Sequence, residues 1–199
     1  MTYPYADVAS FHGYGYTQPE DIVQGVAQLK QTLKKHGLAS RELWDTEASW
    51  GITTTDDQEQ EVSWLMRFHV AQAVSGVSRF VWYAYDNCAW GTLWGAACGA
   101  SPDNWQGVRL PGEAYGNLED WVAGASLNHC DAYEDGLWAC ELQRPGGYEG
   151  WILWDSTGTV RSVPIPSQLQ LTKYRDWRNN SRVLPGEIII DQMPVIVEN

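Results

Sequence analysis

Alternation of strand-like and helix-like segments in the first 125 residues constrains the fold more than any other feature of the sequence. Segments 7–12, 41–49 and 78–86 have strand character, and each is followed by apolar residues at a helical spacing. Strands that are connected through helices pair in parallel, with the helices outside the sheet. The sequence therefore predicts an α/β fold of about three βα units.

The predicted helices have recognisable signals at their ends. Capping boxes begin at Thr17 and at Asp56, and Gly37 and Gly76 provide the corresponding stops. Pro111 introduces a third helix after a long loop rich in Gly, Ala and Trp. These signals place one helix after each of the predicted strands, as a βα series requires.

The pattern changes after residue 124. Segments 137–143 and 148–155 flank an Arg-Pro-Gly-Gly turn and predict a β-hairpin. Because no helical spacing survives in this half, we expect an α/β domain over 1–125 and a small, sandwich-like antiparallel β-domain over 126–199. Further strands are expected at 159–165, 182–190 and 194–198.

Charge and hydropathy argue against two classes of partner. The chain has 199 residues with 13 Lys and Arg against 25 Asp and Glu, and its net charge of −12 would repel a phosphate backbone. No run approaches the roughly 18 apolar residues that cross a bilayer, and the first residues lack the basic and apolar regions of a signal peptide. We therefore expect neither a nucleic acid nor a membrane as a partner.

The aromatic residues favour a different kind of ligand. The chain contains 12 Trp and 10 Tyr but only 3 Phe, so most rings combine an apolar face with a polar group. Such rings suit flat, half-polar ligands such as sugars. The alternative interpretation is that they fill cores and interfaces.

The four cysteines lie in two close pairs. Cys88 and Cys98 are ten residues apart, as are Cys130 and Cys140, and neither pair has the C-x-x-C spacing of a zinc or thioredoxin motif. Of the three possible connectivities we favour these two local disulfides, each stabilising by roughly 2–3 kcal/mol on the loop-entropy estimate. Four free thiols in a cytosolic protein are the alternative. Disulfides would indicate an oxidising compartment.

Motifs for other chemistries are missing from the sequence. It contains neither the G-x-S-x-G turn of an esterase nor the G-x-x-x-x-G-K loop that binds nucleotide phosphates. No second ligand pair accompanies His129 and Asp131 at a metal-binding spacing. We expect no metal and no cofactor, and we interpret His69 as a helix-packing residue.

Unusual polar and aromatic residues gather at the ends of the three predicted strands. Ligands of α/β sheets bind at the carboxyl ends of the strands. Alternation places Asp45 and Glu47 on one face of the second strand, and Trp50 flanks them. A carboxylate that faces an imidazole and a phenol is suited to act as a nucleophile or a metal ligand, whereas a solvated Glu is the plain alternative. The residues concerned are His12, Tyr14, Asp45, Glu47, Trp82, Asp86 and Asn87.

Segments 10–14, 44–51 and 79–87 resemble the last three βα units, equivalent to strands six to eight, of retaining glycoside hydrolases built on the (β/α)₈ barrel. The resemblance covers about residues 5–125, and members with a β-rich domain after the barrel are the most similar. It implies a glycosidase that hydrolyses O-glycosyl bonds of an oligo- or polysaccharide and acts in the extracellular space or periplasm.

The same resemblance implies roles for individual residues. Glu47, in a Thr-Glu context, matches the nucleophile of these enzymes. His12 and Tyr14 match residues that hold the nucleophile, and Trp82 matches a Trp that floors the sugar subsite. Trp50, Asp86 and Asn87 would contribute to substrate binding.

One part of the family pattern has no counterpart here. The acid/base Glu of the resembled enzymes follows an Asn on the fourth strand, and no Asn-Glu pair precedes Glu47. A complete barrel needs about 250 residues and eight units. We therefore expect a missing N-terminal segment or another chain to complete the barrel, and little or no activity from this chain alone. The alternative function is a non-catalytic, carbohydrate-binding or structural remnant.

Overall fold

The computed structural model describes residues 6–51, 57–87, 90–95 and 107–199. The chain forms two compact units, Met1–Gly112 and Glu113–Asn199. The division falls inside helix α3 (Leu110–Val122), so this helix belongs mainly to the second unit, whereas the sequence placed the boundary at 125.

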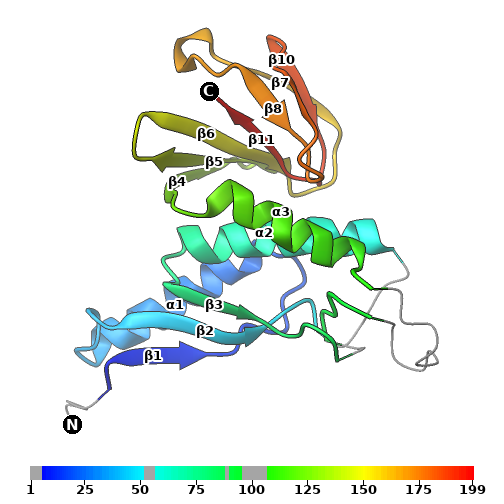
Figure 1. Ribbon diagram of the computed structural model, residues 1–199. Helices are drawn as coiled ribbons and strands as arrows, with labels where there is room; N and C mark the ends of the chain where they lie inside the picture. The colour runs from blue at the N-terminus through cyan, green and yellow to red at the C-terminus, as the bar shows by residue number, and fades with distance from the viewer. Residues whose placement is uncertain (1–5, 52–56, 88–89, 96–106) are drawn as a thin grey trace. The chain divides into compact units, whose positions relative to one another are not determined.

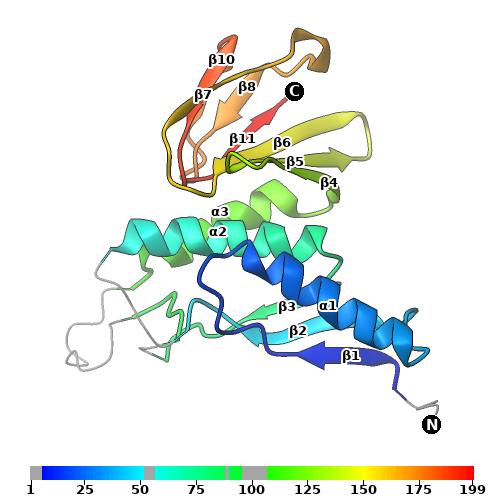
Figure 2. The ribbon, with the colours of Figure 1, turned by 180° about the vertical axis from the view of Figure 1, so that it is seen from behind.

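The first unit contains a three-stranded parallel sheet. Strands β1 (Val8–Phe11), β2 (Glu42–Ala48) and β3 (Arg79–Trp82) follow one another in the order β1-β2-β3, and both neighbouring pairs are parallel. Helices α1 (Asp21–Lys35) and α2 (Gln58–Val74) lie on the same side of this sheet (Figures 1 and 2). The predicted parallel sheet, with a helix after each of its first two strands, is therefore confirmed. The third strand is shorter than the expected 78–86.

Helix α1 begins later than its sequence signal suggests. The predicted capping box at Thr17 is wrong, because the N-cap residue is Glu20 and its side chain makes no capping hydrogen bond. Instead, the Gln18 N–H donates to the Asp21 carboxylate over 3.0 Å, which forms a turn before the helix. The Glu20 carboxylate accepts hydrogen bonds from Arg67 of α2. A contact from a distant part of the chain thus outweighs the local capping motif.

Helix α2 has the cap that its sequence predicts, shifted by one residue. Asp57 is the N-cap, and its side chain accepts hydrogen bonds from the N–H groups of Glu59 and Gln60. Asp56, the first residue of the predicted box, lies outside the described residues. The helix buries many of its side chains, including four polar ones, so it packs on more than one face. The buried apolar residues are Val62, Leu65, Met66, Phe68, Val70 and Ala71.

The second unit contains antiparallel sheets. Its six-stranded sheet has the order β4-β5-β6-β11-β8-β9, and a two-stranded sheet pairs β10 with β7. The predicted hairpin is confirmed, with β5 paired to β6 from Leu137↔Asp155 to Arg144↔Tyr148. The strands are β4 (Ser126–Ala132), β5 (Leu137–Arg144), β6 (Tyr148–Asp155), β7 (Arg161–Pro164), β8 (Lys173–Arg175), β9 (Ser181–Val183), β10 (Glu187–Ile190) and β11 (Val195–Glu198).

Two details of this unit differ from expectation. The predicted strand 182–190 is two strands, because Pro185 and Gly186 interrupt it between β9 and β10. Strands β4 and β8 have no clear sequence signal, since both are rich in polar or charged residues. Leu153 and Val197 of the larger sheet pack against Ile188 and Ile190 of β10, so β7 and β10 cover part of that sheet.

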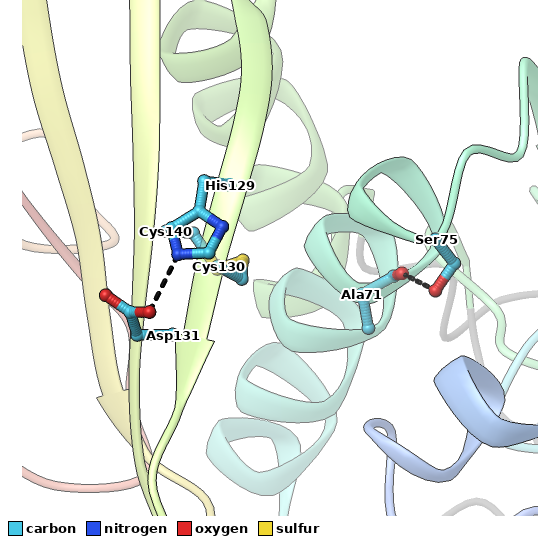
Figure 3. Close-up of a disulfide and its surroundings, with 6 residues drawn as sticks. All are labelled: Ala71, Ser75, His129, Cys130, Asp131 and Cys140. Carbon is cyan, nitrogen blue, oxygen red and sulfur yellow. Dashed lines mark hydrogen bonds and ion pairs between the residues drawn. A yellow bond between two sulfur atoms is a disulfide. The ribbon is translucent and has the colours of Figure 1, made fainter.

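One of the two expected disulfides is present in the described residues. Cys130 of β4 and Cys140 of β5 are directly paired across the strands and form a disulfide (Figure 3). Next to it, His129 Nε2 lies 2.7 Å from Asp131 Oδ1, an exposed pair that Figure 3 also shows. Cys88 and Cys98 lie outside the described residues. The pairing of Cys130 with Cys140 is therefore confirmed.

A buried carboxylate at the end of β11 should make the stability of the second unit depend on pH. Glu198 is 2% exposed and accepts two hydrogen bonds from Arg175, at 2.7 and 2.9 Å, and one from Tyr148 at 2.5 Å. Burial opposes its ionisation, but these donors outweigh burial and lower the pKa of Glu198 below its ordinary value. Burial and the Glu198 hydrogen bond raise the pKa of Tyr148 to about 12.

Because the pKa of Glu198 is lower in the folded than in the unfolded state, its contribution is complete above the ordinary Glu value and is lost as pH falls through the folded value. We expect the difference in unfolding free energy between the wild type and Glu198→Gln to shrink between pH 7 and pH 3. Urea denaturation at both pH values measures this difference. A difference of the same size at both would contradict the assignment.

Candidate active site

A bulge in β2 determines how the central carboxylates point. Asp45 pairs with Phe80 and Ala48 pairs with Trp82, so two residues of β2, Thr46 and Glu47, stand opposite the single residue Val81 of β3. Asp45 and Ala48 share the buried face, while the Glu47 side chain is 37% exposed. The expectation that Asp45 and Glu47 share one face is therefore wrong. The bulge turns Glu47 out of the buried layer at the carboxyl end of the sheet.

Tyr14 and Glu47 form the centre of the candidate site. The Tyr14 hydroxyl donates a hydrogen bond of 3.1 Å to Glu47 Oε1, and His12 Nδ1 lies 4.0 Å from Glu47 Oε2. Burial, followed by the hydrogen bond and the charge of Glu47, raises the pKa of Tyr14 well above its ordinary value. Tyr14 is therefore a protonated donor throughout the neutral range. The structure brings together three of the residues that the sequence singled out.

Asp45 lies directly beneath this pair. Its Oδ1 accepts hydrogen bonds from the Gly13 N–H over 3.1 Å and from the Glu47 N–H over 3.4 Å, and its Oδ2 accepts from the Gln72 side chain. Burial raises the pKa of Asp45, although the three hydrogen bonds oppose that change. A Cβ atom at Gly13 would overlap the Asp45 carboxylate, so only Gly fits there. Neither Gly13 nor Gln72 has a sequence signal that marks it as part of the site.

Trp82 and Trp50 form a mostly enclosed aromatic pair. Trp82 is 8% exposed, and its indole N–H donates a 2.7 Å hydrogen bond to the Gly91 carbonyl. The two indoles meet edge to face at 5.1 Å. The Trp50 N–H is buried and has no hydrogen-bond partner among the residues that the structure describes. The role of Trp82 as a sugar platform stays a prediction, because little of its ring is open to a ligand.

His69 supports Trp82 from helix α2. Its ring stacks on Trp82 with the centroids 5.3 Å apart and an interplanar angle of 22°, and Nδ1 lies 2.8 Å from the Leu65 carbonyl. Burial lowers the pKa of His69 to about 4, so its ring is neutral near pH 7. The interpretation of His69 as a helix-packing residue is confirmed.

Two exposed tyrosines follow the buried Trp82 at the end of β3. Tyr83 is 38% and Tyr85 is 60% exposed, whereas Trp82 is buried. The Tyr85 ring stacks on Trp94 with the centroids 6.0 Å apart. Sequence reasoning missed these tyrosines, although the alternation from residue 79 onward was a usable signal. They offer more open ring surface than Trp82.

Asp86 and Asn87 differ in what they contact. Asn87 Oδ1 accepts a hydrogen bond of 2.8 Å from the Trp90 N–H, and the Trp90 ring packs edge to face on Tyr14 at 5.2 Å. Asn87 thus shapes the loop that places Trp90 against the candidate site. Asp86 is exposed, and no contact given by the described residues joins it to Glu47. Its role in substrate binding stays a prediction.

Within the described part of the chain, no group of three or more His, Cys, Asp or Glu side chains is placed to hold a metal ion. None of the helices there is both long and apolar enough to cross a membrane.

No protein-family profile matches this chain, and no curated protein matches it either. Solved structures do match. A family 39 glycoside hydrolase from Bacteroides cellulosilyticus WH2 has a TM-score of 0.71 at 16% identity over 96% of this chain and 44% of its own. A glucosidase from Croceicoccus marinus has a TM-score of 0.64 at 12% identity over 96% of this chain and 53% of its own.

A family 39 β-xylosidase from Caulobacter crescentus matches with a TM-score of 0.59 at 14% identity, over 97% of this chain and 51% of its own. This chain thus spans about half the length of these structures. At such low identity the similarity shows the fold alone. The chain has a mixed α/β fold that is similar to part of the fold of these glycoside hydrolase structures.

Proposed function

We propose that this chain carries the nucleophile of a retaining glycoside hydrolase, and that the nucleophile is Glu47. The observation that carries the proposal is the hydrogen bond from Tyr14 to Glu47 at the carboxyl end of the parallel sheet, where the bulge of β2 exposes the Glu47 side chain. In this proposal, β1, β2 and β3 are equivalent to barrel strands six, seven and eight. The similar glycosidase structures support a partial glycoside hydrolase fold, within which we propose this equivalence.

The geometry suits the first step of retaining hydrolysis. The Tyr14 hydroxyl donates its hydrogen bond to Oε1 of Glu47. The other oxygen, Oε2, is therefore the one that attacks the anomeric carbon to form a glycosyl ester. The bond from that carbon to the leaving oxygen breaks, and an acid must give this oxygen a proton. Water then releases the sugar. Retaining enzymes use two carboxyl groups about 5–5.5 Å apart for these steps.

Asp45 is unsuited to be the second carboxyl group. It is fully buried, and its two oxygens accept three N–H hydrogen bonds, so it faces protein donors and cannot reach a leaving group. We propose that the acid/base residue comes from polypeptide outside this chain. Such a partner would also pair with the open edges of β1 and β3, each of which has a neighbouring strand on one side only in the described sheet.

The proposed substrates are neutral oligo- or polysaccharides. A net charge of −12 does not disfavour them, and the Trp90 ring, which packs on Tyr14 next to Glu47, offers an apolar face to sugar C–H groups. We propose an extracellular or periplasmic location. The Cys130–Cys140 disulfide supports it, because disulfides persist in oxidising compartments.

Covalent labelling tests the proposed nucleophile. We expect 2,4-dinitrophenyl 2-deoxy-2-fluoro-β-glucoside or the corresponding xyloside to add one fluoroglycosyl group to the chain, because dinitrophenolate leaves without a proton donor. Intact-mass spectrometry detects the adduct and peptide mapping locates it at Glu47. Methyl glycosides, which need the missing acid, should be turned over little or not at all. An adduct at another residue, or none, would refute the assignment.

A non-catalytic sugar-binding function is the second candidate, and the exposed rings of Tyr83 and Tyr85 favour it. Stacking on such rings needs no carboxylate. Binding of an oligosaccharide that survives Glu47→Gln but is lost in Tyr85→Ala, measured by calorimetry, would favour this function over the enzyme.

A further inference from the structure

We infer that Asp45 is a positioning residue that holds Tyr14 and Glu47 together, an inference whose catalytic meaning rests on the proposed function. Asp45 touches neither hydroxyl nor carboxylate of the pair. It acts through the backbone on both sides of the Tyr14–Glu47 hydrogen bond.

The two backbone donors to Asp45 belong to the two halves of the site. One donor is the N–H of Gly13, the residue immediately before Tyr14, and the other is the N–H of Glu47 itself. Both end on the same oxygen, Oδ1, although they lie on segments more than 30 residues apart in sequence. One buried acceptor therefore fixes the distance between the loop after β1 and the end of β2.

The bulge explains why β2 needs such an acceptor. A bulge leaves its extra residue outside the regular ladder of the sheet, so the N–H groups there need another partner. Asp45 supplies that partner for Glu47 from two positions earlier on the same strand. The residue that precedes the bulge thus also stabilises the conformation that exposes Glu47.

Helix α2 fixes the orientation of the Asp45 carboxylate. The Gln72 amide donates to Oδ2, and this contact leaves Oδ1 aimed at the two backbone groups. Gln72 is 1% exposed and Asp45 is fully buried, so water does not compete for this contact. Gly13 completes the arrangement, because any side chain there would displace the carboxylate. The hydrogen bonds that Asp45 accepts from Gly13, Glu47 and Gln72 join the loop after β1, the strand β2 and the helix α2 at one point.

Three variants of Asp45 separate positioning from charge. Asp45→Ala removes the acceptor. Asp45→Ser keeps an oxygen, but its side chain is too short for that oxygen to reach both N–H groups. Asp45→Asn keeps a carbonyl oxygen for both N–H groups, and a flip of the Gln72 amide turns its Oε1, unpaired among the described residues, toward the new NH₂ group so that it accepts a hydrogen bond. A displacement of about 1 Å at a reacting group can cost about 100-fold in rate. We expect Glu47 labelling to slow about 100-fold in the Ala and Ser variants and only a few-fold in Asn.

The pKa of Tyr14 provides a test of the positioning role of Asp45 that needs no substrate. In full-length protein with [ζ-¹³C]tyrosine, the Tyr14 signal is assigned by its loss in Tyr14→Phe, and its shift is followed from pH 7 to 12. In the wild type and Asp45→Asn it should remain protonated far above the ordinary tyrosine value. In Asp45→Ala and Asp45→Ser, separation from Glu47 should bring its pKa back toward that value.

Circular dichroism identifies the variants that fold. If Asp45→Ala does not fold, Asp45→Ser is used for both measurements in its place. Unchanged Tyr14 ionisation in a folded Ala or Ser variant would overturn the positioning role, even if Glu47 is labelled. A changed Tyr14 ionisation without any labelling of the wild type would leave the positioning intact and reject the glycosidase. The two failures are therefore distinguishable.

Discussion

Replacement of Glu47 by Gln is expected to abolish covalent labelling by the fluoroglucoside and the fluoroxyloside. A Gln amide is close to the carboxylate in shape, and its oxygen can still accept the hydrogen bond from Tyr14. It is a very poor nucleophile at an anomeric carbon. The variant therefore changes the chemistry while leaving the contacts of the site in place, and intact-mass spectrometry should detect no adduct.

Glu42→Gln is the matched control for this result. Glu42 lies on the same strand, is exposed, and accepts a hydrogen bond from the Trp44 indole over 2.8 Å, but the proposal gives it no role in the reaction. Labelling of this variant should proceed at the wild-type rate. Labelling of Glu47→Gln at that rate would remove the basis for a glycosidase, because the family resemblance, the Tyr14 contact and the exposure of the side chain all concern this one carboxylate.

Local signals predicted most of the fold. The parallel β1-β2-β3 sheet follows from strand and helix periods, and the β5–β6 hairpin follows from its Pro-Gly-Gly turn. The start of α1 could not be predicted in this way, because Arg67, 47 residues away, binds the Glu20 carboxylate. The short polar strands β4 and β8 are held by pairing with their neighbours, which leaves no period in their own sequence.

The site was predictable in its centre and not in its surroundings. The rule that ligands gather at strand ends is enough to predict that His12, Tyr14 and Glu47 lie close together. The bulge after Asp45 was not predicted, because it depends on the register of β2 with β3. The burial of Trp82 was not predicted either, because it depends on packing against His69 of helix α2. Sequence spacing reports what one segment does, and these two features arise between segments.

Removal of the Arg67 side chain is expected to destabilise the first unit by about 3–5 kcal/mol. Arg67 is 4% and Glu20 is 9% exposed, and the guanidinium donates to both carboxylate oxygens, over 2.7 and 2.8 Å. Arg67→Ala would remove both guanidinium hydrogen bonds from the buried Glu20 carboxylate at the start of α1. The large cost comes from the loss of this buried ion pair, and urea denaturation followed by circular dichroism measures it.

Arg79→Ala provides a comparison within the same unit. Arg79 is exposed and stacks over the Trp44 ring at 4.4 Å, so its loss should cost no more than about 1 kcal/mol. The double variant Glu20→Gln with Arg67→Met should lose less than the sum of its single variants, because no unpaired charge remains in it. A loss below about 1 kcal/mol for Arg67→Ala would mean that water reaches Glu20. In that case the ion pair could not be what moves the start of α1 from Thr17 to Asp21.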